Sequence, residues 1–102
     1  MKESFTQRQI LNYLAYRPGK FWRQNTGAAV TVYKGKRSFT RFGLPGSADI
    51  SGLRDGRRIE IEVKAPKGRQ TIYQEQFQKM IEENGGLYVL ARSLEDVQKA
   101  GL

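Results

Sequence analysis

The sequence predicts an α/β domain in which a mixed β-sheet is flanked by helices, and two patterns lead to this expectation. Stretches with apolar residues at helical spacing alternate with stretches rich in β-branched and aromatic residues. The segment 58–91 reads as strand, helix and strand, and it has the length of a parallel crossover. At 102 residues, we expect one domain over 1–102 with a single modest core.

The expected order is helix, several antiparallel strands, helix, strand, helix. The first helix covers 3–16, because Ile10, Leu11 and Leu14 form an apolar stripe that ends before Pro18-Gly19. Short β-prone pieces bounded by turn residues predict the strands that follow. These strands are 20–25, 28–33, 38–42, 47–53 and 58–64.

The last third of the chain is predicted to form the crossover. Thr71 and Gln74 have the spacing of a capping box, so a helix is expected over 71–84. Gly85-Gly86 ends it. A nearly all-apolar strand at 87–91 and a last helix at 94–100 complete the predicted fold.

The stretch from Pro45 to Lys64 contains the strongest functional pattern. Asp55-Gly56 predicts a tight hairpin turn, which places Asp49 directly opposite Glu62 on two antiparallel strands. Two carboxylates about 5 Å apart repel each other and destabilise a sheet, so a cation is expected between them. Lys64 lies two residues beyond Glu62 and projects from the same face.

The two faces of this hairpin differ sharply. One face carries Ile50, Ile59, Ile61 and Val63 and is expected to enter the core. Glu60 lies on the other face with the two acids, and we expect it at the rim of the site. Gly46, in the loop before the hairpin, either lets the backbone approach a metal or phosphate or is a plain turn glycine.

Composition narrows the chemistry. The chain has no cysteine and no histidine, which excludes disulfides, thiolate or imidazole ligands, and nucleophile–histidine pairs. A metal must therefore be held by oxygen, which favours Mg²⁺ or Mn²⁺ over Zn²⁺. The sequence has no apolar run of membrane-spanning length, and its start lacks the apolar core of a signal peptide.

The charge of the chain predicts a polyanionic partner. The net charge is +8, from 18 Lys and Arg against 10 acids, and many basic residues are interleaved with aromatic ones. The basic residues that we expect at DNA phosphates are Lys34, Lys36, Arg37, Arg41, Lys67 and Arg69. The simpler alternative is that those near 34–41 only solvate a hairpin.

The acid pair and the lysine fit phosphodiester hydrolysis. Asp49 and Glu62 would be direct metal ligands, and the backbone carbonyl of Val63 is the natural third. Lys64 would orient or deprotonate the attacking water, or stabilise the phosphate. Glu3, from the first helix, would bind the metal through water. Taken alone, this pattern is weak, since a solvated charged strand has the same composition.

Several motifs in order make the chain similar to a known family. Over nearly its whole length the sequence resembles VRR-NUC domains (virus-type replication-repair nucleases) of the PD-(D/E)xK superfamily. The segments that carry the resemblance are Glu3 at the start of the first helix, Trp22 to Gly27, Gly43 to Asp49, Ile61 to Lys64, and Gln74 with Phe77 and Gly85-Gly86.

This resemblance implies a restriction-endonuclease-like fold and a Mg²⁺- or Mn²⁺-dependent deoxyribonuclease. It places Asp49, Glu62 and Lys64 in the catalytic core, Glu3 in metal support and Gln74 beside the site. Family members of this length, in phages and bacteria, resemble Holliday-junction resolvases and act as homodimers. A cytoplasmic protein of a bacterial or phage-infected cell is therefore implied.

The residues leave alternatives open. A non-catalytic nucleic-acid-binding module on the same fold would show the same basic surface. Gln74 serves either the site or only the capping box. Trp22 is either a core or dimer contact or a platform for base stacking, and we favour the contact.

Overall fold

The protein is described by a computed structural model, which covers residues 2–24, 28–41 and 44–102, with the side chains of 28–33 and 37–41 left aside. The elements within these ranges are α1 (Glu3–Leu14), β1 (Lys20–Arg23), β2 (Ala28–Tyr33), β3 (Lys36–Arg41), β4 (Ile50–Arg54), β5 (Arg57–Val63), α2 (Ile72–Glu83), β6 (Leu87–Ala91) and α3 (Leu94–Lys99). The predicted order of helix, antiparallel strands, helix, strand and helix is confirmed. None of the helices in the described ranges is long and apolar enough to cross a membrane.

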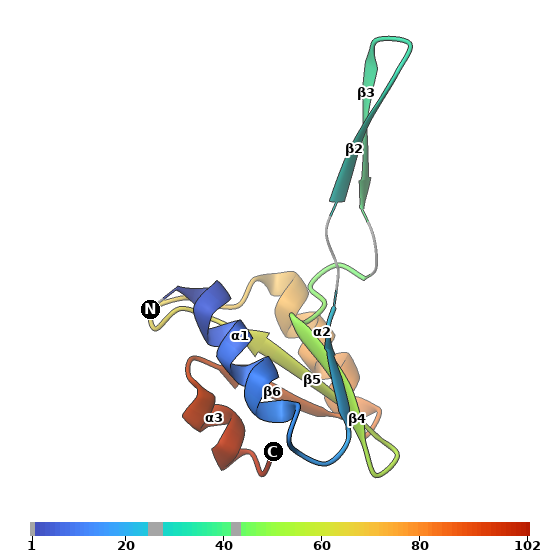
Figure 1. The fold of residues 1–102 in the computed structure, drawn as a ribbon. Coiled ribbons are helices and arrows are strands. Elements are labelled where there is room, and N and C mark those ends of the chain that lie inside the picture. Colours follow the sequence, from blue (N-terminus) through green and yellow to red (C-terminus); the bar gives the residue numbers. More distant parts are fainter. Residues whose placement is uncertain (1, 25–27, 42–43) are drawn as a thin grey trace.

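The main sheet has four strands in the order β1-β4-β5-β6. β4 pairs with β1 and with β5 in antiparallel fashion, whereas β6 lies parallel to β5. Helix α2 connects β5 to β6 as the predicted crossover. The sheet is therefore mixed, and helices lie on both sides of it (Figure 1).

The two faces of the sheet have separate apolar clusters. On one face, Ile50, Ile61 and Val63 pack with Ile10 of α1 and Val97 of α3. On the other face, the smaller cluster contains Ala48, Tyr88, and Phe77 and Ile81 of α2. The predicted alternation along the central hairpin is confirmed, and it sends the acidic side chains to the α2 side of the sheet.

Strands β2 and β3 form a second, two-stranded sheet. The sequence groups them with the other antiparallel strands, but the structure shows a ribbon that projects from the body of the domain (Figure 1). Its turn, Lys34-Gly35, has φ of 50° and 76°, as two-residue hairpin turns of the primed type require. The ribbon contributes to the elongated shape, 51 × 32 × 26 Å.

Helix α2 begins as predicted. The Thr71 side chain accepts a hydrogen bond from the Gln74 backbone N–H, and the Gln74 side chain accepts one from the Thr71 N–H. This capping box satisfies two backbone donors that the first turn of a helix would otherwise leave without partners. At the other end, Gly85 takes a φ of +83°, the left-handed conformation that stops a helix at low cost.

Candidate active site

The acid pair lies at the open end of the central hairpin. Ile50 pairs with Ile61, so the next opposed positions in this antiparallel register are Asp49 and Glu62. Asp49 stands just before β4, and its Oδ2 accepts a hydrogen bond from the Val63 N–H at 2.8 Å. The Asp49 backbone carbonyl accepts from the Gln24 N–H at 2.8 Å, which fixes the position against the end of β1. The structure thus brings the two predicted acids together.

Glu62 is a buried acid with an unused oxygen. The residue is 4% exposed, and its Oε2 has no hydrogen-bond partner among the described residues. Burial, the hydrogen bond with Asp49 and repulsion by the Asp49 charge raise the pKa of Glu62 to about 9; Lys64 acts in the opposite direction. In the metal-free protein, Glu62 therefore holds a proton at neutral pH.

Lys64 and Glu3 lie at the same end of β5. The Lys64 backbone N–H donates to the Ala91 carbonyl at 2.9 Å, which extends the β5–β6 pairing, and its ammonium charge acts on Glu62. Glu3 Oε1 accepts a hydrogen bond from the Ala65 N–H at 3.0 Å, so the first turn of α1 is tied to the strand end. Its charge also acts on Glu62.

The described part of the chain contains no group of three acidic side chains spaced to hold a metal ion. Glu3 is therefore not grouped with Asp49 and Glu62 as a third direct ligand, and its role through water stays a prediction. A cation at this place would rely on the two carboxylates and a backbone carbonyl, as the sequence predicts with Val63.

Gln74 is used by the helix. Its side-chain oxygen accepts a hydrogen bond from the Thr71 N–H at 2.9 Å, which is the capping role that the sequence left open.

The structure explains why a glycine stands at position 46, which sequence reasoning missed. Its φ is +78°, and a Cβ here would lie 2.3 Å from the Tyr73 carbonyl carbon and oxygen. The loop before Asp49 therefore rests against the backbone of α2.

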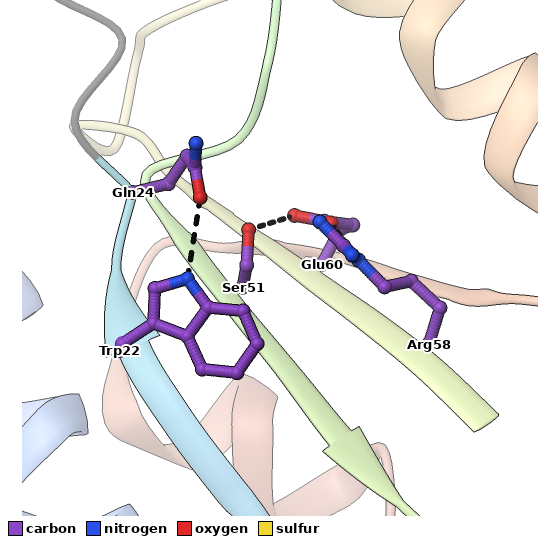
Figure 2. Close-up of polar contacts among 5 residues, drawn as sticks. All are labelled: Trp22, Gln24, Ser51, Arg58 and Glu60. Carbon is purple, nitrogen blue, oxygen red and sulfur yellow. Dashed lines mark hydrogen bonds and ion pairs between the residues drawn. The ribbon is translucent and has the colours of Figure 1, made fainter. Parts of the chain in front are cut away.

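The expectation that Glu60 lies at the rim is wrong. Glu60 is 1% exposed, and both of its oxygens have partners inside the fold that offset the lost hydration. Ser51 donates to Oε2 at 2.7 Å and the Arg58 Nε–H donates to Oε1 at 2.6 Å. Figure 2 shows these side chains over the sheet beside Trp22 and Gln24, where the Trp22 indole N–H donates to Gln24 Oε1 at 3.3 Å.

The sequence contains a pattern that could have predicted the cluster of Ser51, Arg58 and Glu60. Arg58 and Glu60 are two residues apart, so they project from one face of a strand, and Ser51 stands opposite Glu60 in the predicted register. Trp22 stands opposite Ser51 on β1. It is only partly buried, and it borders the acidic face rather than either apolar cluster.

The predicted DNA contacts fall into two places. Lys67 and Arg69 are exposed in the loop that follows β5, close in sequence to Lys64. Lys34 and Lys36 are exposed at the tip of the β2–β3 ribbon. Arg37 and Arg41 belong to β3, and their side chains lie outside the described part.

Comparison with known proteins adds no family assignment. Neither the protein-family models nor the curated proteins contain a match to this chain.

Proposed function

We propose that this protein is a Mg²⁺- or Mn²⁺-dependent endonuclease that hydrolyses DNA phosphodiester bonds. The observation that carries the proposal is the acid pair itself. Glu62 is a buried acid with one oxygen that has no partner among the described residues; it faces a second acid, and a lysine lies two residues further along the chain. The resemblance to VRR-NUC domains assigns catalysis to these same three residues.

The residues fit a divalent cation. An unpartnered buried oxygen is costly, and repulsion between two acids adds to that cost. A cation bound by Asp49, Glu62 and the Val63 carbonyl would remove both costs and displace the proton from Glu62. All three donors are oxygens, the ligand type that Mg²⁺ and Mn²⁺ prefer. Bound there, the metal would supply Lewis-acid stabilisation of the phosphate and an acidified water.

The remaining groups have roles that follow from their positions. Lys64 orients the attacking water or stabilises the negative charge of the phosphate, since its ammonium group acts at the acid pair. Glu3 supports water bound near the site from the first turn of α1. Gln74 keeps the start of α2 in place beside the loop that leads to Asp49.

DNA is the substrate that the charge distribution favours. The segment 28–41 contains four basic residues and no acid, and it forms a ribbon that extends away from the body (Figure 1). Lys67 and Arg69 would hold backbone phosphates nearer the acid pair. We propose a homodimer that resolves branched DNA such as Holliday junctions, because symmetric cuts need two sites related by a two-fold axis. We place it in the cytoplasm of a bacterial or phage-infected cell.

The alternative proposal is a non-catalytic nucleic-acid-binding module. One observation favours it: without a cation, the acid pair is a closed arrangement in which Glu62 keeps a proton and shares a hydrogen bond with Asp49. Such a pair would be structural, and its loss would affect folding rather than chemistry.

Cleavage of a four-way DNA junction tests the two proposals. We expect cleavage with Mn²⁺ or Mg²⁺ that stops on chelation, and a loss of at least about 100-fold in Lys64→Ala, on the scale of losing one charge-stabilising group. Lys79→Ala, a change of an exposed lysine on α2, is the matched control and should keep full activity. Asp49→Ala and Glu62→Gln should abolish cleavage while DNA binding persists.

Absence of metal-dependent cleavage in the unmodified protein, with no difference in Lys64→Ala, would defeat the nuclease proposal. A panel of four-way, flap, single-stranded and duplex DNAs then identifies the preferred substrate.

A further inference from the structure

The Arg58–Glu60 pair has no part in the chemistry above, yet it is built at a high cost. A carboxylate that is 1% exposed loses nearly all of its hydration, and only paired hydrogen bonds offset that loss. Glu60 binds Ser51 and Arg58, and Arg58 itself remains half exposed, with 50% of its side chain accessible. The buried acid therefore holds the base of a guanidinium group whose other end reaches solvent.

The guanidinium group of Arg58 is held in one orientation, but only part of its hydrogen-bonding capacity is used. Its Nε–H donates to Glu60, and its Cζ lies 6.0 Å from the centre of the Trp22 ring, within the range of a cation–π contact. Its two terminal nitrogens have no hydrogen-bond partner among the residues that the structure describes. These nitrogens form the fork that binds phosphate oxygens in a bidentate manner.

Three other arginines, Arg54, Arg57 and Arg92, differ in this respect. Arg54 donates to the backbone carbonyls of Pro18 and Gly101. Arg57 donates to the backbone carbonyl of Gly85. Arg92 donates to the carbonyls of Pro66 and Gly68. Those guanidinium groups fasten loops to the domain. Arg58 is instead anchored by an acid through Nε, and its terminal nitrogens bond to no group of the described residues.

The position of Arg58 relates it to the acid pair. Arg58, Glu60 and Glu62 alternate along β5, so they share a face, and four residues of strand span about 13 Å. Beside Arg58 and Glu60 lies a hollow of about 230 Å³ whose lining also includes Gln24, Ser47, Ser51 and Phe77, but neither acid of the pair. The backbone N–H of Gln24 donates to the Asp49 carbonyl, so one residue of the lining is bonded directly to a residue of the acid pair.

We propose that Arg58 binds the phosphate of a nucleotide that neighbours the scissile one, and that this nucleotide occupies the hollow. Glu60 is a positioning residue that acts through Arg58, and Trp22 supports the guanidinium plane. The inference rests on the proposed function, because it takes DNA as the ligand and the acid pair as the place of cleavage.

Equilibrium binding of a fluorescent four-way junction, measured in EDTA over a range of salt concentrations, tests the proposal without requiring activity. We expect Arg58→Gln to weaken binding by about ten-fold, the effect of losing a hydrogen bond to a charged group. The slope of log K against log salt should fall by about 0.9, the value for one lost phosphate contact. Arg58→Lys keeps the charge but loses the fork, so it should keep the slope and weaken binding several-fold.

Arg57→Gln is the matched control, since it removes the same charge from the adjacent residue, whose side chain projects from the opposite face of β5. This variant should keep an affinity within about two-fold of that of the unmodified protein. Its salt slope should stay within about 0.2 of the unmodified value. If Arg58→Gln leaves Glu60 unpaired and does not fold, Arg58→Gln/Glu60→Gln removes both charges and carries the same expectation. Where the single variant also folds, the loss in the double variant should equal that of Arg58→Gln, because Glu60 acts only through Arg58.

An unchanged salt slope in every foldable Arg58→Gln variant would overturn the proposal, even if the protein cleaves DNA. A double variant that binds much more weakly than Arg58→Gln would overturn the positioning role of Glu60. If the unmodified protein binds DNA but never cleaves it, the nuclease proposal fails while the slope still reports on Arg58.

Discussion

At the scale of single residues, the electrostatics of Glu62 distinguish this protein from an ordinary charged strand. A surface glutamate keeps its hydration, whereas Glu62 is buried beside Asp49 and its pKa rises to about 9. The folded state therefore binds the proton more tightly than the unfolded chain, in which the pKa is 4.5. This contribution to stability is complete below about pH 4.5, declines as the pH rises, and is lost by about pH 9.

We predict that Glu62→Gln, which mimics the protonated acid, removes this pH dependence. In thermal unfolding at pH 8 without metal, its Tm should exceed that of the unmodified protein by at least about 5 °C, or roughly 1 kcal/mol. At pH 5 the two should agree closely. Glu82→Gln, at an exposed position of α2, should follow the unmodified protein at every pH.

Added Mn²⁺ extends this test. At pH 8 it should raise the Tm of the unmodified protein. The matching gain in the free energy of unfolding is about 2.7 kcal/mol at a hundred-fold excess of Mn²⁺ over its Kd. It should not raise the Tm of Glu62→Gln to the same extent. Parallel pH profiles for the two proteins would show that Glu62 carries its charge in the folded state.

At the scale of elements, the contact between α2 and the loop before β4 controls where Asp49 stands. Gly46 lies against the backbone of Tyr73 and Gln74 at the start of α2, and the capping box holds that start in a fixed form. The loop carries Ser47 and Ala48 directly into Asp49. The helix N-terminus thus supports the acid pair through packing of main chain on main chain.

We predict that Gly46→Ala costs at least about 3 kcal/mol, because the new Cβ meets backbone in addition to the penalty for positive φ. Gly56→Ala is a matched control: its φ is +75°, close to the +78° of Gly46, but a Cβ there meets nothing within 4 Å. It should cost only about 1–2 kcal/mol. Chemical denaturation of both variants measures the difference, and equal losses would show that the loop moves freely from the helix.

At the scale of the whole molecule, two surfaces of a single chain are not packed against other described parts of the protein: the β2–β3 ribbon and a groove beside α2. Within the described residues, the β2–β3 ribbon pairs with no third strand, and a two-stranded hairpin alone is marginally stable in water. Beside α2, a groove of about 310 Å³ is lined largely by apolar residues, among them the exposed Leu44, Tyr73 and Met80. The radius of gyration, 15.1 Å, exceeds the roughly 13 Å of a compact chain of this length.

We predict that the apolar groove is covered in the proposed homodimer. Light scattering should give twice the mass of one chain at micromolar concentration, and Met80→Lys should shift the protein to monomer without loss of secondary structure. Tyr16→Lys places the same charge on a more exposed aromatic residue that does not line the groove, and it should leave the dimer intact. A monomer with full activity on four-way junctions would contradict the dimer.

Much of this fold could be read from local pattern. The alternation along 47–64, the Asp55-Gly56 turn and the Thr71–Gln74 capping box each depend on neighbours in sequence, so the opposition of Asp49 and Glu62 was predictable. The separation of β2 and β3 from the main sheet was not, because β-prone sequence does not specify which strand it pairs with.

The sequence by itself determined the acid pair, its lysine, the oxygen-only ligand chemistry and the excess of positive charge, since residue type and strand period suffice for these. Only the tertiary structure decided the environment of each group. It buried Glu60 against Ser51 beneath Arg58, and it left one oxygen of Glu62 without a partner among the described residues. It also directed Gly46 against α2. Burial and desolvation depend on elements far apart in the chain, and no local pattern records which side chains those elements will cover.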